Sequence, residues 1–493
     1  MKFKGRLLGT LVEKFYHSIM RLSYLILLLL LLVPSAYSEG LPELGEASQT
    51  DLSPLQERQL GESIMREIRA DPSYYDDPPL NDYLNNLGYR LISSSRDPKT
   101  SLELFAIQDK EINAFSLPGG YIGVNTGLIL LTQSESELAS VLAHEMGHIM
   151  QHHIARMVGE QKWSIATSLA TLAVAILAAR SNSQASQAAM VGGQAAAAQS
   201  QLNFTREYEL EADRIGFQTL NNAGLDVRAM PAFFERMQKA IRFVEGSAPS
   251  YLRTHPLTYE RIADMENRAQ SVPYRQVPVS QDFQFIRARL RAQEESPKDA
   301  ITNFESSLQE KKYISEAAQH FGLAVALMRV KNYDRAEQEL SQSRKMAQPD
   351  PLIELVAGQI KLGEGKIAET IAIYQAALKR YPEYRPLVYA TSNVYLLNHQ
   401  PEEALKLISD RLQYYPQDYH LYLLQAKSYA DLDKKLLQHK SQAEAYYLLG
   451  NLRGAVEQLQ IAQKSGDGDF YQLSAVEARL KELRSLEAEA KKQ

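Results

Sequence analysis

The most chemically informative segment of this chain is the run His144-Glu145-Met146-Gly147-His148. Residues four apart lie one above the other on a helix, so the two imidazoles would point to one place and could bind a zinc ion. Glu145 lies beside them, where its carboxylate could accept a proton from water. The pattern predicts a catalytic zinc site with one ion per subunit, whereas a surface helix with incidental histidines is the alternative.

The residues before this motif predict the helix that carries it. An apolar helical texture extends from Leu138 to Ala143, and Ser134 with Glu137 matches a capping box at the start. Gly147 is small enough for another element to pack close to the metal. Residues 126–131 lead directly into this helix. Further helices are expected over 55–69, 80–92, 205–220, 231–244 and 259–269, and strands over 102–107 and 121–125.

A catalytic zinc needs a third protein ligand and one open position. The chain has no cysteine, so this ligand must supply nitrogen or oxygen. Glu209 and Asp213 lie four apart on one face of an expected helix, so the glutamate could bind the metal while the aspartate braces an imidazole. Glu207 and Glu211 have the same spacing, and a solvated acidic face explains the pattern as well. Spacing alone does not choose among these readings.

The segment after the motif has an unusual composition. Trp163 to Ala179 is apolar, and Ser181 to Gln201 is rich in Ser, Gln, Ala and Gly. We interpret residues 159–201 as a mobile lid over the active site, with a membrane-inserted hairpin or, for the first half, a buried core helix as alternatives. His152 and His153 are interpreted as surface or lid-contacting residues.

The N-terminal residues have the features of a secretory signal. Basic residues precede an apolar run from Tyr24 to Val33, and Ala36-Tyr37-Ser38 offers small residues before a cleavage point at Glu39. We expect a signal peptide over 1–38, with an uncleaved anchor as the alternative. The net charge of −5 shows no basic footprint, so a nucleic-acid partner is not expected.

The region from about residue 281 onward repeats with a period of 34 residues. Small residues recur at this spacing in two series, which are Ala336, Thr370 and Ala404, and Ala324, Gly358 and Ser392. Pro382 and Pro416 end successive units, and tyrosines supply the large side chains between them. These features predict an α-solenoid of tetratricopeptide repeats over 281–493, with an irregular helical bundle as the alternative.

The motifs together resemble peptidase family M48. Its members carry His-Glu-x-x-His followed by Glu-x-x-x-Asp, matched here by Glu209 to Asp213, and a His-Pro pair with an arginine six residues on, matched by His255 and Arg261. The resemblance covers roughly residues 55–270. It implies a zincin-like metalloprotease domain with a small β-sheet, in which His144, His148 and Glu209 bind zinc and Glu145 and Asp213 serve catalysis, Asp213 as the brace.

The same resemblance implies how the substrate binds and how the chain is divided. The stretch Phe115–Gly120 with Gly127 and Leu128 resembles the substrate-facing edge of the family, so we expect an extended substrate along Tyr121, Ile122, Gly123, Val124 and Asn125. The fold class is mainly α. The expected organisation is a signal peptide, a linker over 39–54, a peptidase domain over 55–272 and the repeat domain.

His255 is the residue whose role is most open. The resemblance places its ring near the zinc, where it could occupy the open position and hold the enzyme inactive until substrate displaces it. Alternatively, His255 and Arg261 could stabilise the oxyanion of the tetrahedral intermediate, or His255 could merely cap a helix. We favour the inhibitory ligand, because a protease among partly folded clients needs restraint.

With the signal in front and the repeats behind, the resemblance narrows to periplasmic members that edit outer-membrane proteins. It implies a periplasmic zinc endopeptidase with chaperone-like activity, which degrades misassembled outer-membrane β-barrel proteins and promotes their assembly. The implied partners are such unfolded proteins and, through the repeats, the outer-membrane β-barrel assembly complex, with peripheral membrane contact. The alternatives are a membrane-integrated protease and a repeat-based chaperone or docking module with minor proteolysis.

Overall fold

The computed structural model describes residues 52–160, 206–241 and 250–490. The expected signal peptide and the apolar segment Trp163–Ala179 lie outside these residues, as does most of the expected lid. Among the helices that the structure describes, none is both long enough and apolar enough to span a membrane.

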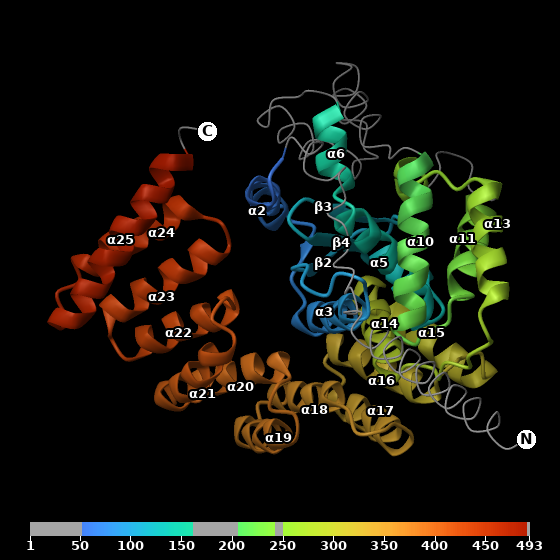
Figure 1. The fold of residues 1–493 in the computed structure, drawn as a ribbon. Coiled ribbons are helices and arrows are strands. Elements are labelled where there is room, and N and C mark those ends of the chain that lie inside the picture. The colour runs from blue at the N-terminus through green and yellow to red at the C-terminus, as the bar shows by residue number, and fades with distance from the viewer. Residues whose placement is uncertain (1–51, 161–205, 242–249, 491–493) are drawn as a thin grey trace, which may run out of the picture. The chain divides into compact units, whose positions relative to one another are not determined.

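The N-terminal part of the described chain combines helices with one small sheet (Figure 1). Ser53 and Asp77 cap the first two helices through their side chains, as expected for N-cap residues. Its elements are α2 (Pro54–Ala70), β1 (Tyr74–Tyr75), α3 (Pro78–Ser93), β2 (Glu103–Ile107), β3 (Ala114–Leu117), β4 (Tyr121–Asn125), α4 (Thr126–Leu131), α5 (Glu135–Met150), α6 (His153–Glu160), α10 (Arg206–Asn222), α11 (Ala229–Ile241), α12 (Ser250–Thr254) and α13 (Tyr259–Ser271).

The sheet has the strand order β1-β2-β4-β3. β4 runs parallel to β2 and antiparallel to β3, with Phe115 opposite Gly123. The prediction that Tyr121, Ile122, Gly123, Val124 and Asn125 form an edge strand is therefore wrong. Both sides of β4 are already hydrogen-bonded, which leaves no ladder for a substrate. The edge on this side of the sheet is β3.

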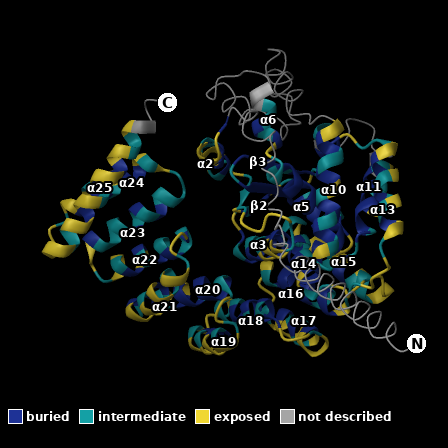
Figure 2. Cartoon of the chain, viewed as in Figure 1, coloured by how far each residue is buried: buried dark blue, intermediate teal, exposed yellow. Residues whose placement is uncertain are grey.

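Helix α5 carries the His-Glu-x-x-His motif and is buried along almost its whole length (Figure 2). The Ser134 side chain accepts from the Glu137 backbone N–H, as a capping box requires. The Glu137 carboxylate instead accepts from the Gln133 N–H and from Arg236, so only half of the predicted capping box forms. The ion pair between Glu137 and Arg236 instead ties the start of α5 to α11.

Helices α5 and α10 approach each other closely along their length (Figure 1). A Cβ added at Gly147 would lie 2.9 Å from the backbone of Ala212, and one added at Gly216 would lie 3.0 Å from that of Ala143. Two glycines, one on each helix, thus allow the backbones to touch, as predicted for Gly147 from its size. This contact brings the residues of α10 next to those of α5.

The remaining residues form successive helices, each of which packs against its neighbours in the chain. The small residues of the 34-residue period are all buried, and at Gly358 an added Cβ would lie 2.0 Å from the Tyr374 ring. The predicted mainly helical fold class is confirmed. The helices are α14 (Gln281–Glu294), α15 (Pro297–Glu310), α16 (Glu316–Arg329), α17 (Tyr333–Met346), α18 (Pro351–Gly363), α19 (Ile367–Arg380), α20 (Arg385–Leu397), α21 (Pro401–Tyr414), α22 (Tyr419–Asp431), α23 (Lys435–Leu448), α24 (Leu452–Gln463) and α25 (Phe470–Ala490).

One hydrophobic core runs from α3 through the helices around the sheet into the helices up to α20. Helix α14 contributes the buried side chains Phe283 and Phe285 to it. Arg287 of this helix donates to the Leu130 carbonyl, and Arg289 pairs with Asp77 at 2.7 Å. The expected domain boundary between residues 272 and 281 stays a prediction, and the core is continuous across it.

Candidate metal centre

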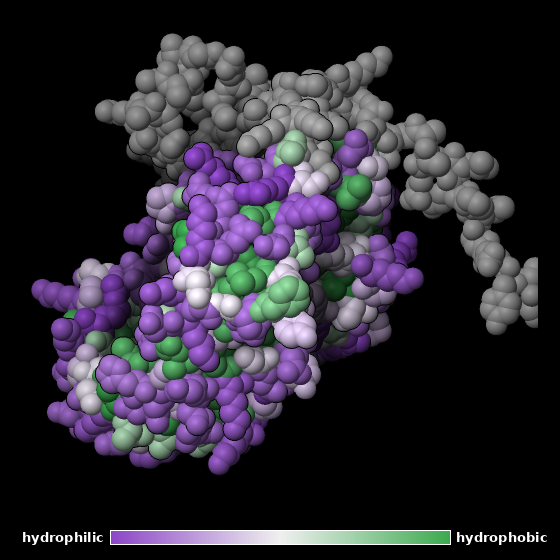
Figure 3. Space-filling model, turned by 90° about the vertical axis from the view of Figure 1, so that its left-hand side faces the viewer, coloured by the Kyte–Doolittle hydropathy of each residue, from purple (hydrophilic) through white to green (hydrophobic). Residues whose placement is uncertain are grey.

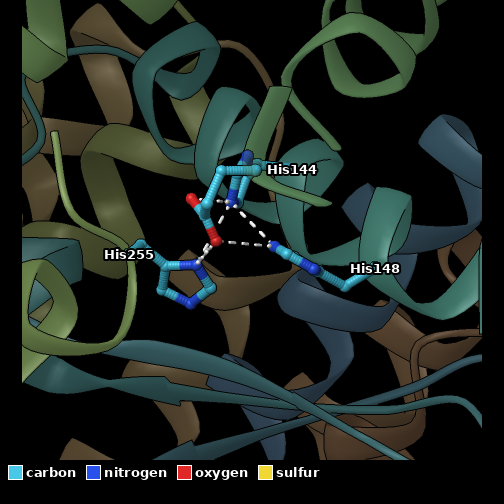
Figure 4. Close-up of side chains that lie close together, drawn as sticks. His144, His148 and His255 are labelled. Carbon is cyan, nitrogen blue, oxygen red and sulfur yellow. Dashed lines mark hydrogen bonds and ion pairs between the residues drawn. The ribbon is translucent and has the colours of Figure 1, made fainter. Parts of the chain in front are cut away.

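Four buried side chains converge at the C-terminal half of α5. His144 and His148 come from this helix, Glu209 comes from α10, and His255 follows the short helix α12. Each offers one ligand atom, and these atoms all lie within 4.8 Å of one another. Figure 4 shows the rings of His144, His148 and His255 around one point. Three residues predicted as ligands and one predicted as a regulatory ligand are thus brought together.

The distances inside this cluster fit a metal ion. The Nε2 atoms of His144 and His148 lie 3.0 Å apart, and Glu209 oxygens lie 3.6 and 3.4 Å from them. Lone pairs of two neutral imidazoles repel each other at such a distance unless a proton or a cation lies between them. Nitrogen and carboxylate donors without sulfur are a common zinc ligand set. The residues present therefore fit the predicted zinc ion.

Asp213 and Arg261 support one side of the cluster. An Asp213 oxygen lies 2.9 Å from Nδ1 of His144, which directs Nε2 of that ring to the common point. Arg261 holds Asp213 with Nε and Nη2 at 2.7 and 2.8 Å. Burial acts to raise the pKa of Asp213, but the charge and hydrogen bonds of Arg261 outweigh it and lower the pKa. Asp213 thus stays an ionised acceptor for His144.

The remaining contacts of Arg261 bear on its predicted role. Its Nη1 donates to the Pro256 carbonyl and lies 2.5 Å from a Glu209 oxygen, and its side chain is 1% exposed. The guanidinium therefore fixes the loop and the helix that present the cluster. This position favours a structural role for Arg261 over the predicted stabilisation of an oxyanion.

Glu145 lies beside the cluster and is fully buried. Its Oε1 lies 3.4 Å from Nε2 of His255. Burial raises the pKa of Glu145, although His255 and His144 act in the opposite direction. A carboxylate with a raised pKa is better matched to general base catalysis near neutral pH than an ordinary glutamate.

His255 occupies a place inside the cluster. Its Nδ1 lies 2.8 Å from a Glu209 oxygen and 3.4 Å from Nε2 of His144. Burial acts to raise the pKa of Glu209, yet the charges of His255 and Arg261 hold it well below its usual range. Thr258, whose side chain accepts from the Arg261 N–H, caps α13. The alternative of His255 as a helix cap is therefore wrong.

His153 is the site residue that sequence reasoning missed. The prediction of a surface position fits His152, whose side chain is 53% exposed, but His153 is fully buried with its Nδ1 2.8 Å from Nδ1 of His148. His152 has a left-handed backbone (φ 50°), which ends α5 and turns the chain back toward the site. The only available signal was a pair of histidines after the motif, of which His153 lies five residues after His148.

The strand next to the cluster is β3. It packs against α5, and Ser116 of β3 lies close enough to Glu145 to lower the pKa of that glutamate, as one of several smaller effects. Within the described residues, the edge strand β3 and the candidate catalytic carboxylate therefore lie side by side.

Comparisons with known proteins match the same two regions. The model for "Peptidase family M48" matches residues 78–269, and a tetratricopeptide repeat model matches residues 361–428. The beta-barrel assembly-enhancing protease of Escherichia coli (strain K12) is 33% identical over 453 residues, which cover 91% of this chain and 92% of that protein. A putative beta-barrel assembly-enhancing protease of Vibrio cholerae is 39% identical over 63% of this chain and 64% of its own. The mitochondrial metalloendopeptidase OMA1 of Schizosaccharomyces pombe is 31% identical over 43% of this chain and 60% of its own.

Proposed function

Because the chain belongs to the beta-barrel assembly-enhancing proteases of peptidase family M48, and is thus a zinc metallopeptidase, we propose that it removes misassembled β-barrel proteins of the outer membrane. The same protein promotes the assembly of barrels that can still be completed. The observation that supports this proposal best is the buried cluster of His144, His148, Glu209 and His255 with Glu145 beside it.

In this proposal, His144, His148 and Glu209 hold the zinc ion. Zinc, when bound, acts as a Lewis acid that polarises the scissile carbonyl and acidifies water. Glu145 is the general base that accepts a proton from the attacking water and then passes it to the leaving amine. Its burial supports this role, because it raises the pKa of Glu145 toward that of a base for neutral conditions. Asp213, held by Arg261, keeps His144 in the orientation that binds.

We assign to His255 the role of a fourth ligand that restrains the resting enzyme. The distances from its Nδ1 to Nε2 of His144 and to Glu209 are similar to those among the three proposed ligands themselves. A substrate carbonyl must then displace this imidazole before cleavage begins. The loop that carries His255 is held by the hydrogen bond from Arg261 to the Pro256 carbonyl. Substrate would therefore displace the His255 side chain while the loop backbone stays in place.

We propose that the substrate pairs with β3 as an added strand. The Asn125 N–H donates to the Asn113 carbonyl, and bonding positions alternate along an antiparallel pair. By this alternation the backbone groups of Ala114 and Ser116 point away from β4, where an extended peptide can pair with them. Backbone pairing needs no particular side chains, which suits substrates that share β-structure rather than a sequence.

The proposal further places the protein in the periplasm, where it meets these clients after removal of residues 1–38. The repeats contact the outer-membrane β-barrel assembly complex. Large apolar side chains are exposed on the repeat helices and their ends, namely Leu397, Tyr414, Phe470 and Tyr471. Hydrophobic patches among hydrophilic residues are visible on the face drawn in Figure 3. Such surfaces on a helical array are typical of protein docking, which also supports a chaperone-like activity alongside proteolysis.

A zinc-dependence assay tests the enzymatic proposal. The purified chain is stripped of metal, divided, and reloaded with zinc or left without it, and both samples receive casein and an unfolded outer-membrane β-barrel protein. We expect cleavage of both substrates only after reloading, with the unfolded barrel cleaved faster. Folded barrel protein is the control and should stay intact. Equal cleavage without metal would exclude the zinc mechanism, and cleavage of casein alone would exclude the substrate class.

A further inference from the structure

His153 is a buried titratable residue that the mechanism above does not use. Its Nδ1 lies 2.8 Å from Nδ1 of His148, and its Nε2 lies 3.1 Å from a Glu211 oxygen. Glu211, two residues after Glu209, therefore also contacts a residue of the site. The three side chains form a line that leads from the candidate ligand His148 toward the surface, where Glu211 is 39% exposed.

One assignment of hydrogens satisfies every contact in this line. If His148 presents the lone pair of Nε2 to a metal, its hydrogen must be on Nδ1. That hydrogen can be donated to His153 only if Nδ1 of His153 is unprotonated. A neutral His153 then carries its hydrogen on Nε2, from where it is donated to the carboxylate of Glu211. Each step thus fixes the tautomer of the next ring.

The packing around His153 holds its ring in place. The ring stacks on Tyr208 with a centroid distance of 4.4 Å and an interplanar angle of 13°. The guanidinium carbon of Arg156 lies 4.5 Å from the centroid of the Tyr208 ring. Its Nη1 is 3.3 Å from the Glu211 oxygen that His153 contacts. Tyr208 and Glu211 flank Glu209 on α10, so the helix that supplies the third ligand also positions His153.

We propose that His153, backed by Glu211, is a positioning residue that sets the tautomer and ring orientation of His148. The two candidate imidazole ligands are then supported differently, His144 by the Asp213 carboxylate and His148 by a neutral imidazole. Ring nitrogens on the outer side of a metal ligand are usually held by a carboxylate, a carbonyl or water. The inference rests on the proposed role of His148 as a zinc ligand.

Two substitutions at one position separate hydrogen bonding from packing. His153→Phe keeps a flat ring against Tyr208 but removes the acceptor. His153→Asn shortens the side chain but places an amide oxygen near the position of Nδ1, where it can accept from His148. Zinc affinity of the full chain is measured by competition with a chromophoric chelator, and the visible spectrum is recorded after loading with Co²⁺.

We expect His153→Phe to lower zinc affinity by about 10- to 100-fold and to shift the Co²⁺ bands, because the ligand ring loses its fixed orientation. His153→Asn should stay within about threefold of the unchanged chain, with its Co²⁺ spectrum preserved. Unchanged affinity and spectrum in His153→Phe would overturn the inference, as would equal losses in both variants.

A second pair of variants keeps the inference testable if His153→Phe does not fold. Glu211→Ala removes the end of the line, whereas Glu207→Ala changes an exposed carboxylate on the same helix and is the matched control. A loss of zinc affinity confined to Glu211→Ala supports the proposed positioning of His148 by His153 and Glu211, and equal affinities overturn it. Failure of the unchanged chain to bind zinc is a separate outcome, because it would refute the proposed metal site itself.

Discussion

Glu207 and Glu209 are two positions apart in the sequence but have different surroundings. Glu207 is exposed, whereas Glu209 is 1% exposed and contacts His255 and Arg261. We predict that Glu209→Gln strongly lowers zinc occupancy, since a neutral amide is a poor zinc ligand and leaves the buried Arg261 less well compensated. Glu207→Gln is the control and should retain full occupancy by elemental analysis. Loss of zinc from the Glu207 variant instead would show that the third ligand is wrongly assigned.

The two possible roles of His255 predict effects of opposite sign. If His255 restrains the resting enzyme as a fourth ligand, His255→Ala should raise both casein cleavage and autolysis severalfold. If it serves the transition state, the same change should lower both, by a factor that corresponds to a few kcal/mol. We predict the increase, because Nδ1 of His255 lies inside the ligand set. Lower cleavage at full zinc occupancy would contradict the restraining role and show that His255 serves the transition state.

The site residues differ in how far the sequence alone could identify them. His144, Glu145 and His148 lie within one helical turn, so local periodicity is enough to place them together. The choice of Glu209 over Glu207 depends on how α10 rotates against α5, which spacing does not encode. His153 depends on a turn with φ 50° at His152, and a positive φ at a histidine has no clear sequence signal.

The contact between α5 and α10 determines the distance between the histidines and Glu209. A helix interior normally gains about 1 kcal/mol when Gly is replaced by Ala. At Gly147 the added Cβ would lie 2.9 Å from the Ala212 backbone, which cannot move without moving α10. Overpacking of this kind costs about 1–3 kcal/mol.

We therefore predict that Gly147→Ala lowers both the melting temperature and the zinc affinity, because α10 must move away and take Glu209 with it. Differential scanning calorimetry of the metal-free protein and a chelator competition measure the two effects separately. A stabilised variant with unchanged zinc affinity would contradict the role of this contact.

The strands show where pattern reasoning fails. The sequence placed a strand at the right residues but assigned it to the edge of the sheet, since strand order is a long-range property. A usable signal was present in the sequence, because Tyr121 to Val124 shows no polar alternation, which is typical of a strand that is covered on both faces. In the structure all five residues of β4 are buried. Gly123 fits this position, as an added Cβ would lie 2.3 Å from the Phe115 ring of the true edge strand.

One hydrophobic core is continuous across the boundary that the sequence suggests between the peptidase region and the repeats. The main core extends from Leu80 to Val394, whereas α23 to α25 have a core of their own. We predict that a chain ending at residue 279 aggregates or unfolds at a lower temperature, because it exposes the surface that Phe283 and Phe285 cover. A chain that ends before α23, at residue 434, should bind zinc and cleave casein normally.

Thermal unfolding and zinc content of both truncated chains check this prediction. Should the shorter chain be as stable as the full one, the peptidase region would be an independent domain after all. Co-purification of the longer chain with the outer-membrane assembly complex then shows whether α23 to α25 take part in docking.

Glu145 acting as the base beside an intact zinc site is the central step of the proposed mechanism. The most direct test measures zinc content and cleavage of an unfolded β-barrel protein in the same preparation of Glu145→Gln. The amide has the shape of the carboxylate but cannot accept the proton, and Glu145 is not among the four clustered donors. We predict one zinc per chain and no cleavage above background. Full cleavage with zinc retained would contradict the mechanism, and loss of zinc would contradict the separation of base from ligands.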